Sequence, residues 1–327
     1  MSNLRVSGKP VKEVIETEIG KIRLVAGDGE VLLGLSGGVD SSVCAALISK
    51  AVGKRLTCVL VDHGLMRKNE AEQVKEAFRD FDLNLICVNA EERFLTRLDG
   101  VTDPESKRKI VGEEFVRVFE ETSAELFPDA DKSGTARQVF LAQGTIYPDI
   151  IESDGVKSHH NVGGLPEKVN FKAIIEPLRE FYKDEVRQIG KALGLPDYLV
   201  HRQPFPGPGL AVRCVGAITK QRLDLLREAD AIFTQEIENS GINAQISQFF
   251  AALTDMRAVG VRDGKRTYGY AVVLRAVETE DYMNAAVAML PWNVLEKASA
   301  RITAEVDGIS RVMYDITSKP PGTIELE

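Results

Sequence analysis

The stretch Ser36-Gly37-Gly38-Val39-Asp40-Ser41-Ser42 follows an apolar run, Val31 to Leu35, and leads into a helical pattern that starts near Ser41. A loop that turns a buried strand directly into a helix offers backbone N–H groups and a helix N-terminus to an anion. Its two glycines let the backbone approach closely, and its serine hydroxyls add donors. We therefore predict that the Ser36–Ser42 loop cradles a multi-oxygen anion, and pyrophosphate is the expected guest.

Two common phosphate loops do not fit this stretch. A Walker loop would end in Gly-Lys-Ser/Thr, and the dinucleotide pattern G-x-G-x-x-G needs a glycine spacing that is absent here. An ordinary tight turn, with Asp40 and Ser41 as helix caps, remains an alternative. Against it stands the position of Asp40, where a carboxylate is expected to hold Mg²⁺ against bound phosphates.

Composition limits the class of protein. A chain of 327 residues, of which 44% are hydrophobic, is expected to form two domains, each with its own core. The net charge of −8 argues against a general nucleic-acid binder. No apolar stretch is long enough to span a membrane and no signal peptide is evident, so we expect a cytoplasmic protein. All four cysteines are expected to be reduced core residues: Cys44, Cys58, Cys87 and Cys214.

Strands and helices alternate at short intervals through the first half, which is typical of an α/β fold with a doubly wound parallel sheet. Loops at the carboxyl ends of such strands bind ligands, and the Ser36–Ser42 loop is one of them. The expected strands are Val31 to Leu35, Leu56 to Val61, Leu83 to Val88, Val139 to Ala142 and Ala173 to Glu176, and the expected helices are Val11 to Leu24, Asn69 to Phe81 and Ser106 to Leu126.

The pattern changes after Gly207-Pro208-Gly209, which fits neither a helix nor a central strand. We place the domain boundary there, with domains at 1–205 and 206–327, and expect the second to be α+β. Its expected elements are a strand at Leu210 to Val215, a helix from Thr219 to about Asn239, a hairpin turning at Asp263-Gly264, helices at Glu280 to Leu290 and Trp292 to Val306, and a strand at Arg311 to Ile316.

Four further segments invite functional interpretation. Asp62 to Arg67 and Gly144 to Asp149 each follow a strand, so they too belong at the carboxyl edge of the sheet. The polar stretch Lys157 to Pro166 resembles a mobile lid, whose lysine could reach phosphate; its adjacent histidines lack further ligands at metal spacing. The tail, Thr317 to Glu327, is either frayed or, stiffened by prolines, a ligand-binding segment.

Taken together, these strings resemble one family. The Ser36–Ser42 loop is similar to the PP-loop of N-type ATP pyrophosphatases, and the whole set resembles the ATP pyrophosphatase subunit of GMP synthetases. The resemblance implies an adenine nucleotide alpha hydrolase-like sheet with a C-terminal dimerisation domain. It implies amination of XMP to GMP through an adenylyl-XMP intermediate, with release of AMP and pyrophosphate.

The same resemblance assigns roles to residues. ATP would bind Ser36, Gly37, Gly38, Val39, Asp40, Ser41 and Ser42. Asp40 and Lys157 would be catalytic, with Asp40 as the Mg²⁺ ligand, and Arg67, Lys319 and Glu325 would bind XMP. Family members often carry histidine and tryptophan where this chain has Gln203 and Leu326.

The resemblance also implies partners. The chain is expected to form a homodimer and to obtain ammonia from a separate glutaminase subunit or from solution, because none of its cysteines has the flanks of a glutaminase nucleophile. Two other readings stay open. One is a different PP-loop enzyme, such as a tRNA-thiolating or NAD-forming one, and the other is a nucleotide-binding module without catalysis.

Overall fold

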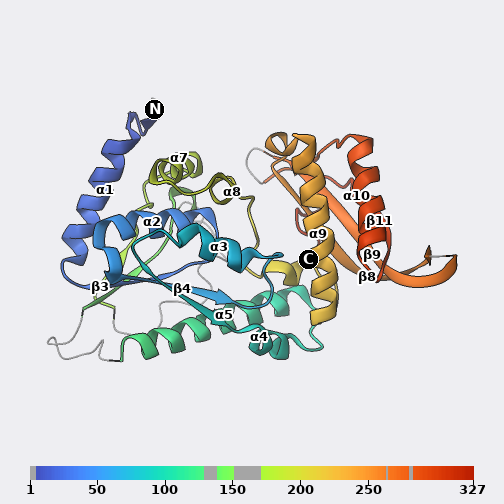
Figure 1. Cartoon of the computed structure of the whole chain (residues 1–327), viewed down its shortest axis with the longest axis horizontal. Coiled ribbons are helices and arrows are strands. Elements are labelled where there is room, and N and C mark those ends of the chain that lie inside the picture. Colours follow the sequence, from blue (N-terminus) through green and yellow to red (C-terminus); the bar gives the residue numbers. More distant parts are fainter. Residues whose placement is uncertain (1–4, 129–137, 151–170, 263, 280–282) are drawn as a thin grey trace. The chain divides into compact units, whose positions relative to one another are not determined.

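The computed structural model describes residues 5–128, 138–150, 171–262, 264–279 and 283–327. The chain forms two compact units (Figure 1). The first comprises Met1–His63, Asn69–Ala90 and Gly112–Arg202, and the second Gly64–Lys68, Glu91–Val111 and Gln203–Glu327. The predicted boundary between residues 205 and 206 stays a prediction, and two earlier segments, Gly64–Lys68 and Glu91–Val111, group with the second unit.

The first unit is built on a five-stranded parallel sheet, as the sequence predicted, and its strands lie in the order β5-β4-β3-β6-β7. The central strand β3 is buried on both faces, which explains its continuous apolar run. The strands are β3 (Glu30–Gly34), β4 (Leu56–Asp62), β5 (Asn84–Asn89), β6 (Val139–Ala142) and β7 (Ile174–Ile175).

Helices cover both faces of this sheet (Figure 1). Helices α1 (Val11–Ala26), α2 (Val39–Val52) and α7 (Lys183–Leu193) pack together on one face. On the other face lies α5 (Pro104–Leu126), whose Phe119 ring comes close to Gly34 of β3. The remaining elements of the unit are β1 (Arg5–Val6), β2 (Lys9–Pro10), η1 (Gly53–Arg55), α3 (Glu70–Phe78) and α8 (Asp197–Val200).

The order of the strands indicates where a ligand would bind. The chain proceeds from β3 outward through β4 to β5, then returns to β6 on the other side of β3 and continues to β7. In open parallel sheets, ligands bind beyond the carboxyl ends of the two strands at which this reversal occurs. Here those strands are β3, which leads into the Ser36–Ser42 loop, and β6, which leads into Gly144.

The second unit is α+β, as predicted. Strands β8 (Gln248–Arg262) and β9 (Lys265–Glu278) form a long antiparallel hairpin that turns next to Gly264; β10 (Ala286–Val287) pairs antiparallel and β11 (Ile309–Tyr314) parallel with β9. Helices α9 (Lys220–Ser240) and α10 (Trp292–Glu305) lie side by side against this sheet (Figure 1). The unit also contains α4 (Glu91–Leu98), η3 (Gly209–Val212) and η4 (Asn243–Gln245).

Two predicted elements of this half are wrong. The strand expected at Leu210 to Val215 is a 3-10 turn, Gly209–Val212, followed by a single bridge from Cys214 to Leu253. Within the described part of the helix expected at 280–290, Ala286–Val287 is instead strand β10. Both segments are short apolar runs, and such runs do not distinguish helix from strand until a partner is present. Strand β9 supplies that partner for β10.

Candidate active site

The Ser36–Ser42 loop is a tight cradle. Gly37 has φ of +77°, a conformation that favours glycine, and the hydroxyls of Ser36 and Ser41 lie 3.0 Å apart. Helix α2 begins at Val39, two residues before the predicted start, and its N-cap residue Gly38 offers no side-chain cap. No side chain of the cap therefore occupies the N–H groups of the first turn, which helix geometry leaves without intrahelical partners. They can receive an anion.

Asp40 lies in the first turn of α2, and its two carboxylate oxygens differ. Oδ2 accepts a hydrogen bond of 2.6 Å from Nζ of Lys183, whereas Oδ1 is buried and has no hydrogen-bond partner among the described residues. The hydroxyl of Ser42, also buried, is equally without a partner there. Buried polar atoms normally find partners, so these two mark positions at which a ligand would complete the site.

Lys183 is a site residue that sequence reasoning missed. It is the first residue of α7, where the helix dipole disfavours a cation, so its placement needs another explanation. Because Lys183 reaches Asp40, the N-termini of α2 and α7 meet at one place. The sequence did offer one signal for it, because a lysine at the first position of a helix that follows the fifth strand is unfavourable unless it has a partner.

The loop after β6 completes the wall of the site. A Cβ atom on Gly144 would lie 2.9 Å from the backbone nitrogen of Ser41, so this glycine allows the loop to press against the start of α2. Further along, the Tyr147 ring meets the Tyr182 ring edge-on at 5.0 Å, beside Lys183. Three chain segments thus converge at the crevice beyond β3 and β6: the Ser36–Ser42 loop, the Gly144 loop and the start of α7.

The residues present fit a Mg²⁺ ion that arrives with phosphate. The described residues contain no group of three or more side chains of His, Cys, Asp or Glu that could hold a metal by itself. Mg²⁺ usually keeps several waters and binds one or two carboxylates together with substrate phosphates. Asp40, with its unfilled buried oxygen, is suited to that role.

Lys157, the predicted catalytic lysine, and the lid Lys157 to Pro166 lie outside the described residues. Their assignment stays a prediction.

Two of the predicted XMP residues fall into one cluster of the second unit. The guanidinium groups of Arg67 and Arg213 both stack on the Phe205 ring, at 4.9 and 5.1 Å from its centre. Arg213 in turn binds Glu325 through two hydrogen bonds of 2.9 and 2.8 Å, and Gln248 donates to the same carboxylate at 3.1 Å. Arg67 and Glu325 are therefore linked through Phe205 and Arg213.

The tail is anchored and not frayed. The backbone of Lys319, the third predicted XMP residue, exchanges two hydrogen bonds with Ala285, and Arg275 donates to the carbonyl oxygens of Thr323 and Ile324. Lys107, fully buried, forms an ion pair with Glu327 and donates to the Cys214 carbonyl at 2.9 Å. No pattern in the sequence indicated that Lys107, Arg213 and Arg275 would be fully buried.

The cysteines follow the prediction with one exception. Cys44, Cys58 and Cys214 are buried, and burial raises the pKa of all three thiols, that of Cys58 to about 12. Cys87 is exposed, so its prediction as a core residue is wrong. It lies on β5, an edge strand, where alternate side chains face solvent.

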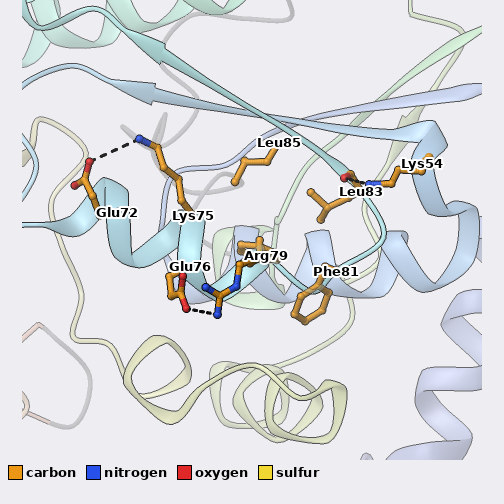
Figure 2. Close-up of a pocket in the computed structure, with 9 residues that line it drawn as sticks. Lys54, Glu72, Lys75, Glu76, Arg79, Phe81, Leu83 and Leu85 are labelled. Atoms are coloured by element: carbon orange, nitrogen blue, oxygen red, sulfur yellow. Dashed lines mark hydrogen bonds and ion pairs between the residues drawn. The ribbon is translucent and has the colours of Figure 1, made fainter.

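A separate cavity of about 420 Å³ lies beside α3 and β5 (Figure 2). Its charged side chains are already matched, with Lys75 directed to Glu72 and Arg79 to Glu76. Because none of its lining residues belongs to the Ser36–Ser42 loop, the Gly144 loop or α7, we do not assign it to the active site.

The parallel sheet, with a glycine- and serine-rich loop and an acidic residue at its point of reversal, defines the first unit as a nucleotide-binding α/β domain of the PP-loop class. In agreement, residues 12–115 match the family model for NAD synthase, and residues 235–326 match that for the GMP synthase C terminal domain. By sequence, the chain is similar to the GMP synthases.

Relatives cover nearly the whole chain. It is 58% identical over 322 residues to the GMP synthase [glutamine-hydrolyzing] of Treponema denticola and 58% identical to that of Finegoldia magna, in each case over 97% of its own length. It spans about 60% of the length of these relatives. Among solved structures, the NH3-dependent NAD synthetase from Campylobacter jejuni is 15% identical, with a TM-score of 0.44, over 71% of this chain and 86% of that one. None of the helices in the described residues has the length and apolar character needed to span a membrane.

Proposed function

We propose that this chain catalyses the ATP-dependent amination of XMP to GMP. The xanthine O2 attacks the α-phosphorus of ATP, a P–O bond forms, and pyrophosphate leaves with the electrons of the broken bond. Ammonia then attacks C2 of the adenylyl-XMP intermediate, and AMP departs. The supporting observation is the convergence of the Ser36–Ser42 loop with Asp40 and Lys183 at the crevice of the sheet, in a chain 58% identical to GMP synthases.

Charge develops on the departing pyrophosphate, and this site supplies fixed positive potential for it. The N–H groups at the start of α2 and the hydroxyls of Ser36, Ser41 and Ser42 bind its oxygens. Mg²⁺, held by Asp40, supplies further neutralisation of this charge when bound. Nζ of Lys183 lies 2.6 Å from Asp40. We propose that Lys183 contacts the same phosphates and that Lys157 adds a second cation.

XMP is assigned to the second unit. Arg67 and Lys319 suit its phosphate, and Glu325 suits N–H or O–H groups of its purine or ribose. The carboxylate of Glu325 already accepts from Arg213 and Gln248. A carboxylate has about four lone-pair positions, so it retains capacity for a ligand.

The same proposal covers partners, domains and location. Ammonia comes from a separate glutaminase subunit or from solution. The domains are residues 1–205 and 206–327, and the protein is cytoplasmic and has no nucleic-acid partner.

A homodimer is supported by an exposed apolar group on the hairpin of β8 and β9. That group comprises Met256, Val259, Val261 and Tyr268, with exposed fractions of 44 to 75%.

The test incubates the chain with ATP, Mg²⁺ and XMP, once with an ammonium salt and once with glutamine, and follows GMP, AMP and pyrophosphate. GMP with ammonium alone supports both the reaction and the ammonia source. Pyrophosphate without GMP would reject XMP as the acceptor, and no product with ammonium would reject the reaction. An Asp40→Asn variant serves as the control, because it keeps the shape of the side chain and removes the charge that holds the metal.

A further inference from the structure

Arg202 connects the Ser36–Ser42 loop to a buried acid. Its Nη1 donates a hydrogen bond of 2.8 Å to the carbonyl oxygen of Gly37, and its Nη2 forms an ion pair with Glu70. Both side chains are largely buried, with exposed fractions of 12% and 3%. A buried pair of this kind holds its members firmly, because either charge left alone would be costly.

This contact controls one donor of the cradle. In a trans peptide, the C=O and the following N–H point in opposite directions, so the direction of the Gly37 carbonyl fixes that of the Gly38 N–H. The Gly38 N–H donates to Ser36 Oγ at 3.3 Å, a long hydrogen bond that an anion could displace. Glycine at 37 and 38 removes the Cβ atoms that would otherwise restrict this peptide, so its orientation needs an external hold.

The residues around Arg202 keep its contact with the Gly37 carbonyl rigid. Glu70 is the first residue of α3, where the helix dipole stabilises a carboxylate. Val74, one turn further along α3, lies 3.3 Å from the place of a Cβ on Gly37. Arg202 itself follows α8 and donates from its backbone to Leu199 at 3.4 Å. Helices α3 and α8 thereby fix the carbonyl side of the loop, opposite the side on which N–H groups face an anion.

We propose that Arg202 and Glu70 are a positioning pair that orients the Gly37–Gly38 peptide for pyrophosphate, without touching the ligand. The inference rests on the proposed function, because it assumes that the loop binds the pyrophosphate part of ATP. It deepens that function by assigning a role to two residues that are not among the predicted nucleotide-binding residues. Loss of the pair frees the peptide to rotate, so affinity for pyrophosphate falls, whereas affinity for XMP stays unchanged.

The test measures Mg²⁺-pyrophosphate binding to the full chain by isothermal titration, and the KM values for ATP and XMP. Arg202→Met removes one charge-assisted hydrogen bond, the one that orients the Gly37–Gly38 peptide. We expect it to weaken Mg²⁺-pyrophosphate binding about tenfold. Arg202→Lys, which keeps the charge but loses the fork, and Glu70→Gln should lie between this variant and the wild type. The matched control is Arg79→Met. Arg79 is the C-cap residue of α3 and forms an exposed ion pair with Glu76, so its loss should change neither pyrophosphate binding nor the KM values.

The outcomes separate the two proposals. If the wild type fails to bind Mg²⁺-pyrophosphate and Mg²⁺-ATP, the proposed function is rejected, and this inference with it. If the wild type binds and Arg202→Met binds equally well, or if its KM for XMP rises in parallel with that for ATP, the positioning role is rejected and the proposed function stands. Should Arg202→Met not fold, Arg202→Lys and Glu70→Gln decide in its place. Added guanidinium that restores pyrophosphate affinity to Arg202→Ala would support the role directly.

Discussion

The guanidinium of Arg213 and the carboxylate of Glu325 form a two-fold hydrogen-bonded ion pair, with distances of 2.9 and 2.8 Å, although 112 residues separate them in the chain. Arg213 is fully buried, so the tail supplies the countercharge that this guanidinium needs inside the second unit. Lys107 stands in the same relation to Glu327. The tail is therefore a structural part of the second unit as well as the proposed XMP-binding segment.

Glu325→Gln should destabilise the second unit by about 3 kcal/mol, because removing one member of a buried pair leaves the other charge uncompensated. Urea unfolding followed by circular dichroism measures the change. Glu305→Gln is the control, since Glu305 pairs with Arg301 on the exposed side of α10, and a change below about 1 kcal/mol is expected there. Equal effects of the two substitutions would contradict the structural role of Glu325.

Deletion of residues 323–327 should have a larger effect than any single substitution in the tail. It removes the countercharges of Arg213 and Lys107 together and the two carbonyl oxygens that accept from Arg275. We expect early proteolysis of the second unit, with fragments ending after residue 202, under conditions in which the full chain resists. A truncated chain that resists protease normally and only requires more XMP would show that the tail is a ligand segment alone.

Gly144→Ala should weaken ATP binding by tenfold or more. The new Cβ would lie 2.9 Å from the Ser41 backbone nitrogen and 3.0 Å from the Asp40 carbonyl carbon, so the start of α2 must move. If this displacement costs about 1.4 kcal/mol of binding free energy, ATP affinity falls tenfold. Gly20→Ala, in α1 with no heavy atom within 4 Å of the new Cβ, is the control and should be neutral or slightly stabilising.

Lys183→Met should reduce affinity for Mg²⁺-pyrophosphate by about tenfold, because one charge-assisted contact to the phosphates is lost. XMP binding should not change. Lys191→Met is matched to it, since Lys191 belongs to the same helix and forms an exposed pair with Asp197 at 3.4 Å. Unchanged pyrophosphate affinity in Lys183→Met would show that Lys183 only neutralises Asp40.

A thiol reagent should modify one cysteine of the native chain, Cys87, at neutral pH. Burial raises the pKa of Cys44, Cys58 and Cys214, so these thiols stay protonated and inaccessible, and their thiolates become relevant only above the ordinary thiol pKa. Peptide mapping after reaction with a maleimide identifies the modified residue, and the denatured chain should react at all four. Rapid modification of Cys58 in the native state would contradict the packing of β4.

The two helices that meet at the site show how far sequence patterns reach. The helix after the Ser36–Ser42 loop was predicted, but its first two residues were not, because glycine at the N-cap carries no side-chain signal that marks the boundary. Lys183 was missed since its partner, Asp40, lies 143 residues away and no local pattern connects them. The wrong strand and helix in the second half were apolar runs whose pairing depends on distant residues.

The sequence alone determined the class of fold, the alternation of strands and helices along the first half of the chain and the position of the Ser36–Ser42 loop, because hydrophobic periodicity and loop chemistry are local properties of the chain. Tertiary structure decided which charges face one another: Lys183 with Asp40, Arg202 with Glu70, and Arg213 with Glu325. A charge can be buried only where a partner from another segment compensates it, and that condition exists only once the segments have packed.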